Sequence, residues 1–183
     1  RAEGGGVANA IRDGTSAVML SGETAVGKYP VESISTMATI ASRAELSLSE
    51  YGYLQRIKSN PSNIVTEAVG QAAVSMSKSL KAAAIISLTE TGFTSRLISK
   101  YRPGIPIIAL TSSATVARKL SMNWGVIPVL YEGKPTDRRR LNFAVKRAKE
   151  QGYLKTGDIV VSASGHHQEA GGTDLLRVVT LEE

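Results

Sequence analysis

Hydroxyl-bearing residues gather in one short stretch of the 183-residue chain, Thr89-Glu90-Thr91-Gly92-Phe93-Thr94-Ser95. The stretch follows an apolar run and opens a helical pattern, the place where helix N-terminal N–H groups and hydroxyls bind phosphate. Ser and Thr also cap helices without a ligand, but four hydroxyls around one glycine exceed what a cap needs. Glu90 opposes a phosphate by on the order of 1 kcal/mol. The stretch therefore predicts an anion site made by Thr89, Thr91, Gly92, Thr94 and Ser95.

Two further segments are candidates for the same chemistry. Arg138-Arg139-Arg140 enters a helix, where positive charge opposes the helix dipole unless an anion is held there. A solvated surface is the alternative, but Arg140 has the geometry to bind a phosphate through two hydrogen bonds. Residues 165–173 form a glycine-rich loop in which Gly171 is able to approach a ligand through its backbone. Adjacent His166 and His167 rarely point at one ion, so a metal site is not predicted.

Another segment has the residue spacing of a nucleotide-binding loop. Gly22-Glu23-Thr24-Ala25-Val26-Gly27-Lys28 fits the spacing G-x-x-x-x-G-K between a strand and a helix. The next residue is Tyr29 instead of a magnesium-binding Ser or Thr, and Pro30 removes an N–H. Glu23 adds negative charge. We therefore interpret this segment as a loop shaped for another purpose.

Composition limits the class of protein. Hydrophobic residues make up 42% and charged residues 21% of a chain with net charge +6 and no cysteine. No apolar run approaches the roughly 20 residues that span a bilayer, so no membrane segment is expected. Disulfides and thiol chemistry are excluded, and a reduced cytoplasm is compatible. Aromatic residues are 5% of the chain and do not alternate with basic ones, so nucleic acid is not an expected partner.

The hydrophobic pattern divides the chain into three segments. Residues 1–48 predict a helix over 7–12, a strand over 16–20 and a helix after Pro30, too little to bury their own apolar faces. Residues 49–61 predict a linker. From 62 to 183, a helix to about residue 80 is followed by strands and helices that alternate. Strands are predicted over 83–88, 106–110, 126–130, 158–163 and 175–181, with helices over 94–101, 114–122 and 137–151. This pattern is typical of an α/β fold, a mainly parallel five-stranded sheet with helices on both faces and an antiparallel last strand.

Several motifs together are similar to those of the pyruvate kinase family. They are Arg1-Ala2-Glu3, Val7-Ala8-Asn9-Ala10, Met19-Leu20-Ser21-Gly22-Glu23-Thr24-Ala25, Tyr29-Pro30, Lys100-Tyr101-Arg102-Pro103, Trp124-Gly125-Val126, Asn142-Phe143-Ala144 and Gly157-Asp158. The resemblance implies that residues 1–48 are the end of a (β/α)8 catalytic barrel. It implies that residues 62–183 are a C-terminal α/β domain for regulation and oligomerisation.

The resemblance also implies an activity. Pyruvate kinases are cytoplasmic glycolytic enzymes, usually homotetramers, that convert phosphoenolpyruvate and ADP to pyruvate and ATP with magnesium and potassium. The catalytic lysine and the metal ligands of the family have no counterpart in these 183 residues, so no cofactor is expected in this chain. Ser21 matches a family serine that supports catalysis near the active site. Val26 replaces a lysine that contacts nucleotide in some members.

For the C-terminal domain the resemblance implies an allosteric site for a sugar phosphate. Residues 89–95 match the segment that holds one phosphate, Arg140 matches an arginine that holds the other, and residues 165–173 match a flap over the sugar. Glu90 and Glu169 depart from this pattern by adding negative charge, and Gly133 replaces a tryptophan. The ligand in family members is often fructose 1,6-bisphosphate. The alternatives for this chain are another phosphorylated sugar, or a vacant or non-responsive pocket.

Three interpretations of the whole chain follow. The first is the C-terminal part of a pyruvate kinase, expected to be inactive alone. The second is a stand-alone module that binds a phosphorylated metabolite without catalysis. The third is an interaction role, in which the strand over 175–181 pairs with its copy in another subunit.

Overall fold

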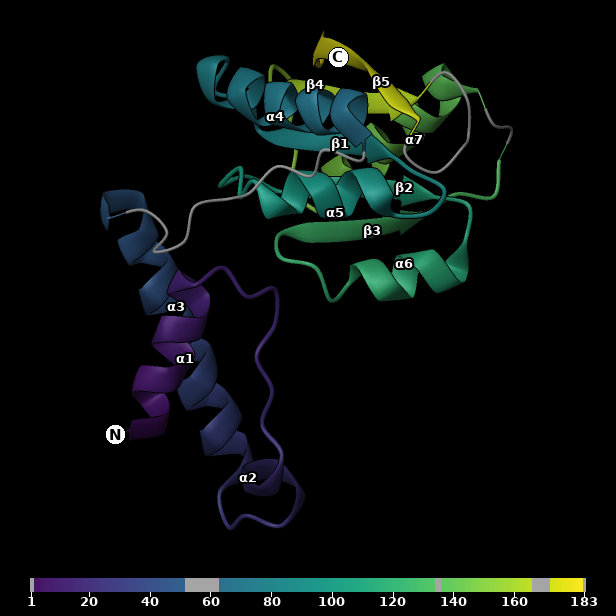
Figure 1. The fold of residues 1–183 in the computed structure, drawn as a ribbon. Helices are drawn as coiled ribbons and strands as arrows, with labels where there is room; N and C mark the ends of the chain where they lie inside the picture. Colours follow the sequence, from purple (N-terminus) through teal and green to yellow (C-terminus); the bar gives the residue numbers. More distant parts are fainter. Residues whose placement is uncertain (1, 52–62, 134–135, 166–171, 183) are drawn as a thin grey trace. The chain divides into compact units, whose positions relative to one another are not determined.

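The computed structural model describes residues 2–51, 63–133, 136–165 and 172–182 (Figure 1). The chain forms two compact units, Arg1–Ile57 and Lys58–Glu183, and each is described by itself. The predicted linker over 49–61 falls largely outside the described residues, so the predicted domain limits stay a prediction. None of the helices in the described ranges combines the length and the apolar character that crossing a bilayer would require.

The first unit is built on two helices that pack together, α1 (Ala2–Arg12) and α3 (Pro30–Tyr51). Ile11 and Ala44 are its buried apolar side chains among the residues described. Helix α1 begins earlier than the predicted helix over 7–12 and includes Gly4, Gly5 and Gly6. At Gly4 a Cβ would lie 3.3 Å from Ile40 Cδ1, so the lack of a side chain at this position lets α3 approach closely.

The predicted strand over 16–20 does not form in this structure. Residues 17–20 have no regular secondary structure, and α2 (Gly22–Ala25) follows as a single turn. A strand of a parallel sheet receives its hydrogen bonds from neighbouring strands, and none lies beside this segment in the described part of the first unit. The prediction of a buried strand is therefore wrong on both counts, because none of residues 16–20 is buried and Met19 is 84% exposed. An apolar run shows neither the neighbouring strands nor the surface that would cover it.

The second unit is a five-stranded α/β sheet, which confirms the predicted fold class. Its strands are β1 (Ala84–Leu88), β2 (Ile107–Thr111), β3 (Val126–Leu130), β4 (Ile159–Gly165) and β5 (Thr173–Thr180). Their order is β3-β2-β1-β4-β5, and only the β4–β5 pair is antiparallel. The helices are α4 (Ile64–Ser79), α5 (Phe93–Lys100), α6 (Ala114–Leu120) and α7 (Asp137–Glu150).

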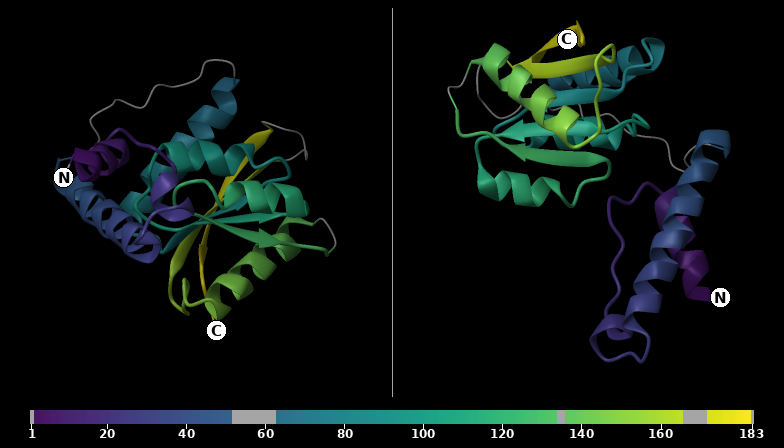
Figure 2. Two further views of the ribbon diagram at one scale, coloured as in Figure 1. Left: turned by 90° about the horizontal axis from the view of Figure 1, so that it is seen from below. Right: turned by 180° about the vertical axis from the view of Figure 1, so that it is seen from behind.

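Helices cover both faces of the sheet (Figure 2). Ile86, Ile108 and Leu110 pack on the face that also holds Leu141 and Ala144 of α7. Ile85 and Ile107 point to the other face, where they meet side chains of α4, α5 and α6. Since successive strand residues point to opposite faces, both sides of β1 and β2 are buried.

The order in which the strands are connected makes the carboxyl ends of the strands, here called the carboxyl edge of the sheet, suited to a ligand. From β1 the chain goes to β2 and β3 on one side, and then crosses through α7 to β4 on the other side of β1. In open α/β sheets, ligands bind outside the carboxyl ends of the strands where the strand order reverses. Here that position is the segment after β1 and the end of β4.

A polar cluster joins α4 to the end of α5. The Glu67 carboxylate, which is buried, accepts hydrogen bonds from the Tyr101 hydroxyl and from Lys100 Nζ at 2.8 Å. Gln71 Nε2 donates to the same Tyr101 hydroxyl at 2.9 Å. Burial, followed by the hydrogen bond to Glu67, raises the pKa of the Tyr101 phenol above its ordinary value of 10.0. The neutral phenol is thus part of the folded structure.

Replacing this hydroxyl tests the cluster. We expect Tyr101→Phe to lower the free energy of unfolding by about 1 kcal/mol near neutral pH, because the hydrogen bond to Glu67 is lost. A phenol pKa raised by folding contributes stability below about pH 10 and loses it as pH rises through the folded value. Urea unfolding at a series of pH values should therefore show the two proteins converging above about pH 10. A difference that grows with pH would contradict the cluster, and Tyr153→Phe, at an exposed position, is the control.

Candidate anion site at the carboxyl edge of the sheet

The segment after β1 forms a tight turn that starts α5. Thr89 is buried, and its Oγ1 accepts a hydrogen bond from the Gly92 N–H at 2.9 Å. Gly92 has φ +77°, which favours glycine, and a Cβ there would lie 3.0–3.2 Å from Arg96, Leu120 and Val116. The turn therefore fixes where α5 begins, and a helix N-terminus presents partial positive charge to an anion.

Thr91 is on the exposed side of this turn. Its Oγ1 accepts from the Phe93 N–H at 3.4 Å, and its carbonyl oxygen accepts from Arg96 Nη1 at 3.1 Å. Arg96 thus lies over the turn and adds positive charge to its solvent side. This arrangement suits the predicted role of Thr91 as a phosphate-binding hydroxyl, a role that stays a prediction.

Thr94 and Ser95 point into the interior. Thr94 Oγ1 forms a hydrogen bond with Thr173 Oγ1, and Ser95 Oγ donates to Ser87 Oγ at 3.0 Å. Both side chains are buried, so their hydroxyls hold α5 to β5 and β1. An anion at this edge would meet their backbone N–H groups more readily than their hydroxyls.

Arg140 joins the same edge from the first turn of α7. Only 4% of the residue is exposed, yet it carries a charge, so it needs a partner. That partner is Glu90, whose Oε1 lies 2.5 Å from Arg140 Nη2. The structure therefore brings together the predicted turn and the predicted arginine, which are 50 residues apart in sequence.

Sequence reasoning missed two features of this arrangement. It treated Glu90 only as a charge that repels phosphate, whereas Glu90 also neutralises Arg140. It did not identify Ser112, whose Oγ donates to the second carboxylate oxygen, Glu90 Oε2. The signal for Ser112 was its position directly after β2, because the carboxyl ends of neighbouring parallel strands share an edge.

The remaining predicted positions are Gly171 and Ser21. Gly171, with Glu169 and both histidines of the glycine-rich loop, lies outside the described residues. Ser21, in the first unit, is exposed, and its N–H donates to Glu23 Oε2 at 3.1 Å. Val26, where some family members have a nucleotide-contacting lysine, is 88% exposed. The predicted roles of Ser21 and Gly171 stay predictions.

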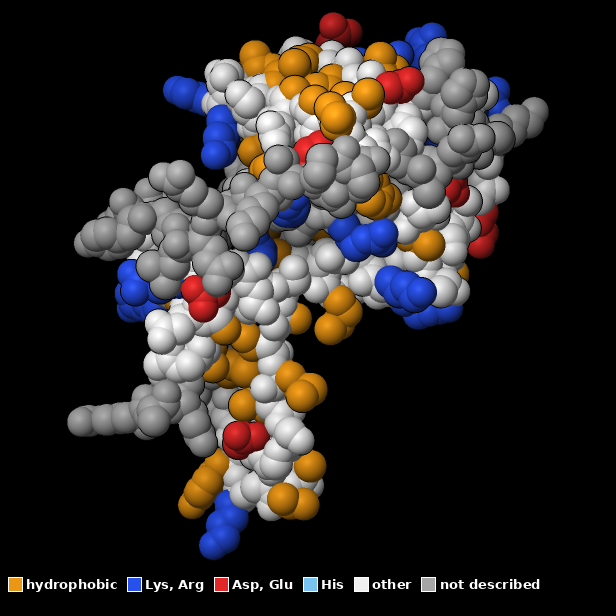
Figure 3. All heavy atoms as spheres, in the orientation of Figure 1, with side chains coloured by type: hydrophobic (Ala, Val, Ile, Leu, Met, Phe, Trp, Pro, Cys, Tyr) orange, Lys and Arg blue, Asp and Glu red, His pale blue; other side chains and the backbone are white. Residues whose placement is uncertain are grey.

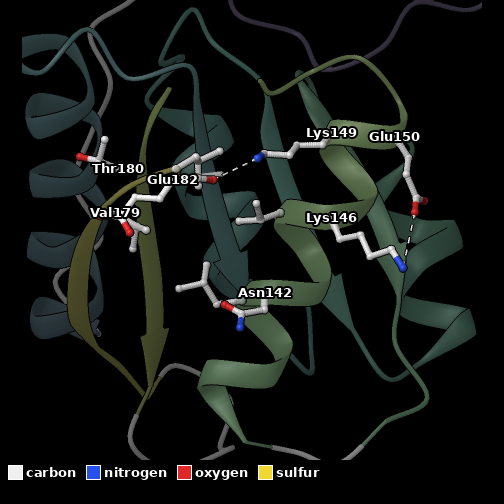
Figure 4. Close-up of a pocket in the computed structure, with 10 residues that line it drawn as sticks. Asn142, Lys146, Lys149, Glu150, Val179, Thr180 and Glu182 are labelled. Carbon is white, nitrogen blue, oxygen red and sulfur yellow. Dashed lines mark hydrogen bonds and ion pairs between the residues drawn. The ribbon is translucent and has the colours of Figure 1, made fainter. Parts of the chain in front are cut away.

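A separate groove of about 550 Å³ lies between α7 and the C-terminal strand (Figure 4). Apolar side chains such as Val145 and Val179 line it, and lysines stand at its margin. Lys149 Nζ donates to Thr156 Oγ1 at 3.1 Å and to the Glu182 carbonyl oxygen at 3.5 Å. None of the predicted site residues that the structure describes lines this groove, so it is treated as separate from the candidate anion site.

Comparison with known proteins decides the family. The family model described as pyruvate kinase, alpha/beta domain, matches residues 67–179, more than half of the chain. The chain belongs to the pyruvate kinase family. The model of the pyruvate kinase barrel domain matches residues 1–34, so parts of two consecutive domains are present. The resemblance to pyruvate kinases that the sequence motifs indicated is confirmed.

Individual pyruvate kinases align along nearly the whole chain. That of Clostridium acetobutylicum is 42% identical over 183 residues, which are 100% of this chain and 39% of that protein. Pyruvate kinase 2 of Synechocystis sp. is 45% identical over 179 residues, 97% of this chain and 30% of that protein. The enzyme of Geobacillus stearothermophilus is 42% identical over 184 residues, 100% of this chain and 31% of that protein. The chain thus spans 30–39% of the length of these relatives.

Proposed function

We propose that this chain works as the C-terminal part of a cytoplasmic pyruvate kinase, which transfers phosphate from phosphoenolpyruvate to ADP. The order of the two family matches carries the proposal, because the barrel model matches before the alpha/beta model within one chain. Magnesium and potassium belong, in this proposal, to the whole enzyme. Among the described residues, no three His, Asp or Glu side chains gather as metal ligands would.

The catalytic proposal is tested on the chain and on the whole enzyme. We expect the purified 183-residue chain to form no pyruvate from phosphoenolpyruvate and ADP in a coupled assay. The physical reason is that a barrel active site is assembled from the ends of several strands, and the barrel match covers residues 1–34 only. The same chain joined to the barrel of a pyruvate kinase relative is the positive control. Turnover by the chain alone at the rate of the joined enzyme would contradict the proposal.

We further propose that the carboxyl edge of the second unit binds a phosphorylated sugar as a regulatory ligand. Support comes from two segments that meet at this edge. One is the turn into α5 with its Thr89 and Thr91 hydroxyls, and the other is the first turn of α7 with the guanidinium of Arg140. A helix N-terminus next to a buried arginine is an arrangement suited to phosphate. The position also coincides with the reversal of strand order, where α/β sheets bind ligands.

Removing the arginine tests this site. We expect Arg140→Ala to bind fructose 1,6-bisphosphate and ribose 5-phosphate at least about tenfold more weakly than wild type, because a charge-assisted contact is lost. Isothermal titration at two salt concentrations measures this. Arg147→Ala is the matched control, since Arg147 lies on the same helix and pairs with exposed Glu150 at 2.7 Å. Equal, salt-insensitive binding by wild type and Arg140→Ala would remove Arg140 from the site.

We also propose that the chain assembles with copies of itself, as a tetramer in the whole enzyme. Strand β5 is at the edge of the sheet, and Leu175 and Val178 on it are exposed. Helix α4 exposes Ile64 and Val65, and apolar side chains gather over α4 and β5 at the top of Figure 3. An open strand edge with apolar surface favours pairing with a second copy.

A lysine on this edge tests the assembly. We expect native mass spectrometry to show dimers or larger species of the wild-type chain, and Val178→Lys to shift them toward monomer. The reason is that a charged side chain on an edge strand opposes strand pairing. Leu130→Lys, at a comparably exposed position on the opposite edge strand β3, is the matched control. A wild-type chain that is only monomeric, or a Leu130→Lys effect as large as that of Val178→Lys, would contradict the proposal.

A further inference from the structure

We propose that Glu90 is a built-in anion that competes with the ligand for Arg140, so that this carboxylate sets the affinity of the site. The inference rests on the anion site proposed above and concerns its regulation. Its basis is the 2.5 Å contact between Glu90 Oε1 and Arg140 Nη2. The arginine side chain is 5% exposed, whereas the glutamate side chain is 22% exposed, so the more accessible of the two charges is the carboxylate.

The carboxylate is held in place from a second side. Ser112 Oγ donates to Glu90 Oε2, so each oxygen of Glu90 has its own partner. The partners come from different segments, the residues after β2 and the first turn of α7. A carboxylate that is positioned on both oxygens loses less entropy on binding the guanidinium than a freely rotating one. Ser112 is therefore a positioning residue, which acts on Arg140 through Glu90.

A phosphate that reaches Arg140 has to replace this carboxylate. Both are oxygen anions that bind a guanidinium with the same hydrogen-bonding geometry, so they compete for the same N–H groups. If the carboxylate remained nearby, it would repel the incoming charge. The same residue therefore lowers the affinity for phosphate twice, by occupying the arginine and by repulsion. Neutralising Glu90 should uncover the site.

The test is a titration of fructose 1,6-bisphosphate into wild type and Glu90→Gln. We expect Glu90→Gln to bind at least about tenfold more tightly, since glutamine keeps the shape but removes the charge. In an Arg140→Ala background the same substitution should give much less gain, because the contested group is absent. Glu150→Gln is the matched control, as it removes an exposed carboxylate that also pairs with an arginine of α7. It should bind like wild type.

A second variant keeps the test independent of folding. Ser112→Ala leaves both charges of the Glu90–Arg140 pair and removes only the contact that positions the carboxylate. We expect a smaller gain in affinity, about twofold to fivefold, corresponding to a net hydrogen bond of about 0.5–1 kcal/mol. Thermal unfolding identifies any variant that has lost its fold, and Ser112→Ala then decides the question alone.

The binding results for these variants distinguish a failure of this inference from a failure of the proposed anion site. If Glu90→Gln and Ser112→Ala bind like wild type while Arg140→Ala binds more weakly, the anion site stands and the competing carboxylate is wrong. If neither wild type nor any folded variant binds the bisphosphate, the proposed site is wrong as well. A gain as large in Glu150→Gln as in Glu90→Gln would show that only the overall charge matters, and would also overturn the inference.

Discussion

Strand β1 is the constraint on which the rest of the second unit depends. Every residue of Ala84–Leu88 is buried, with Ile85 packed toward α4, α5 and α6 and Ile86 toward α7. Parallel neighbours β2 and β4 hydrogen-bond to it on both sides. A strand fixed on two faces and two edges cannot shift without exposing apolar surface or breaking its hydrogen bonds. The turn that follows it is consequently held in one place.

The buried position of Arg140 is tolerated only because that turn is fixed. Removing one partner of a buried ion pair costs about 3–5 kcal/mol, because a charge is left in the interior without compensation. Glu90 supplies this compensation from the end of β1, and Ser112 from the end of β2 orients it. If the proposed site binds phosphate, stability and ligand binding place opposite demands on one carboxylate. Without a ligand the fold needs the charge of Glu90, and a bound phosphate would make that charge excess.

The sequence was sufficient for the architecture of the second unit but not for its polar contacts. Alternating apolar runs and helical periods identified all five strands of the sheet and the antiparallel last one, since these signals are local. The strand expected over 16–20 failed because pairing depends on neighbours that a local pattern does not contain. The turn over 89–92 was identified because it follows a predicted strand and opens a helix, and Arg140 because a basic run at a helix start opposes the helix dipole. The partners of their side chains were not, because a contact between Glu90 and Arg140 is set by how α7 crosses the sheet.

Thr94 shows that residue type alone does not tell whether a hydroxyl in a hydroxyl-rich motif binds a ligand. A hydroxyl in the first turn of a helix is able to face a ligand or to turn inward, and residue type does not distinguish the two. Here Thr94 contacts Thr173 at the start of β5, and Thr66 Oγ1 of α4 donates to the Thr173 carbonyl oxygen at 3.4 Å. Thr173 thus links α5, which begins at the candidate anion site, to α4 and β5, which carry the exposed apolar side chains. Any rearrangement at the start of α5 large enough to break the Thr94 contact would leave two buried hydroxyls without their partner. Hydrogen bonds at Thr173 therefore connect α5, β5 and α4, and such a connection is required if the proposed ligand is to affect the proposed subunit assembly.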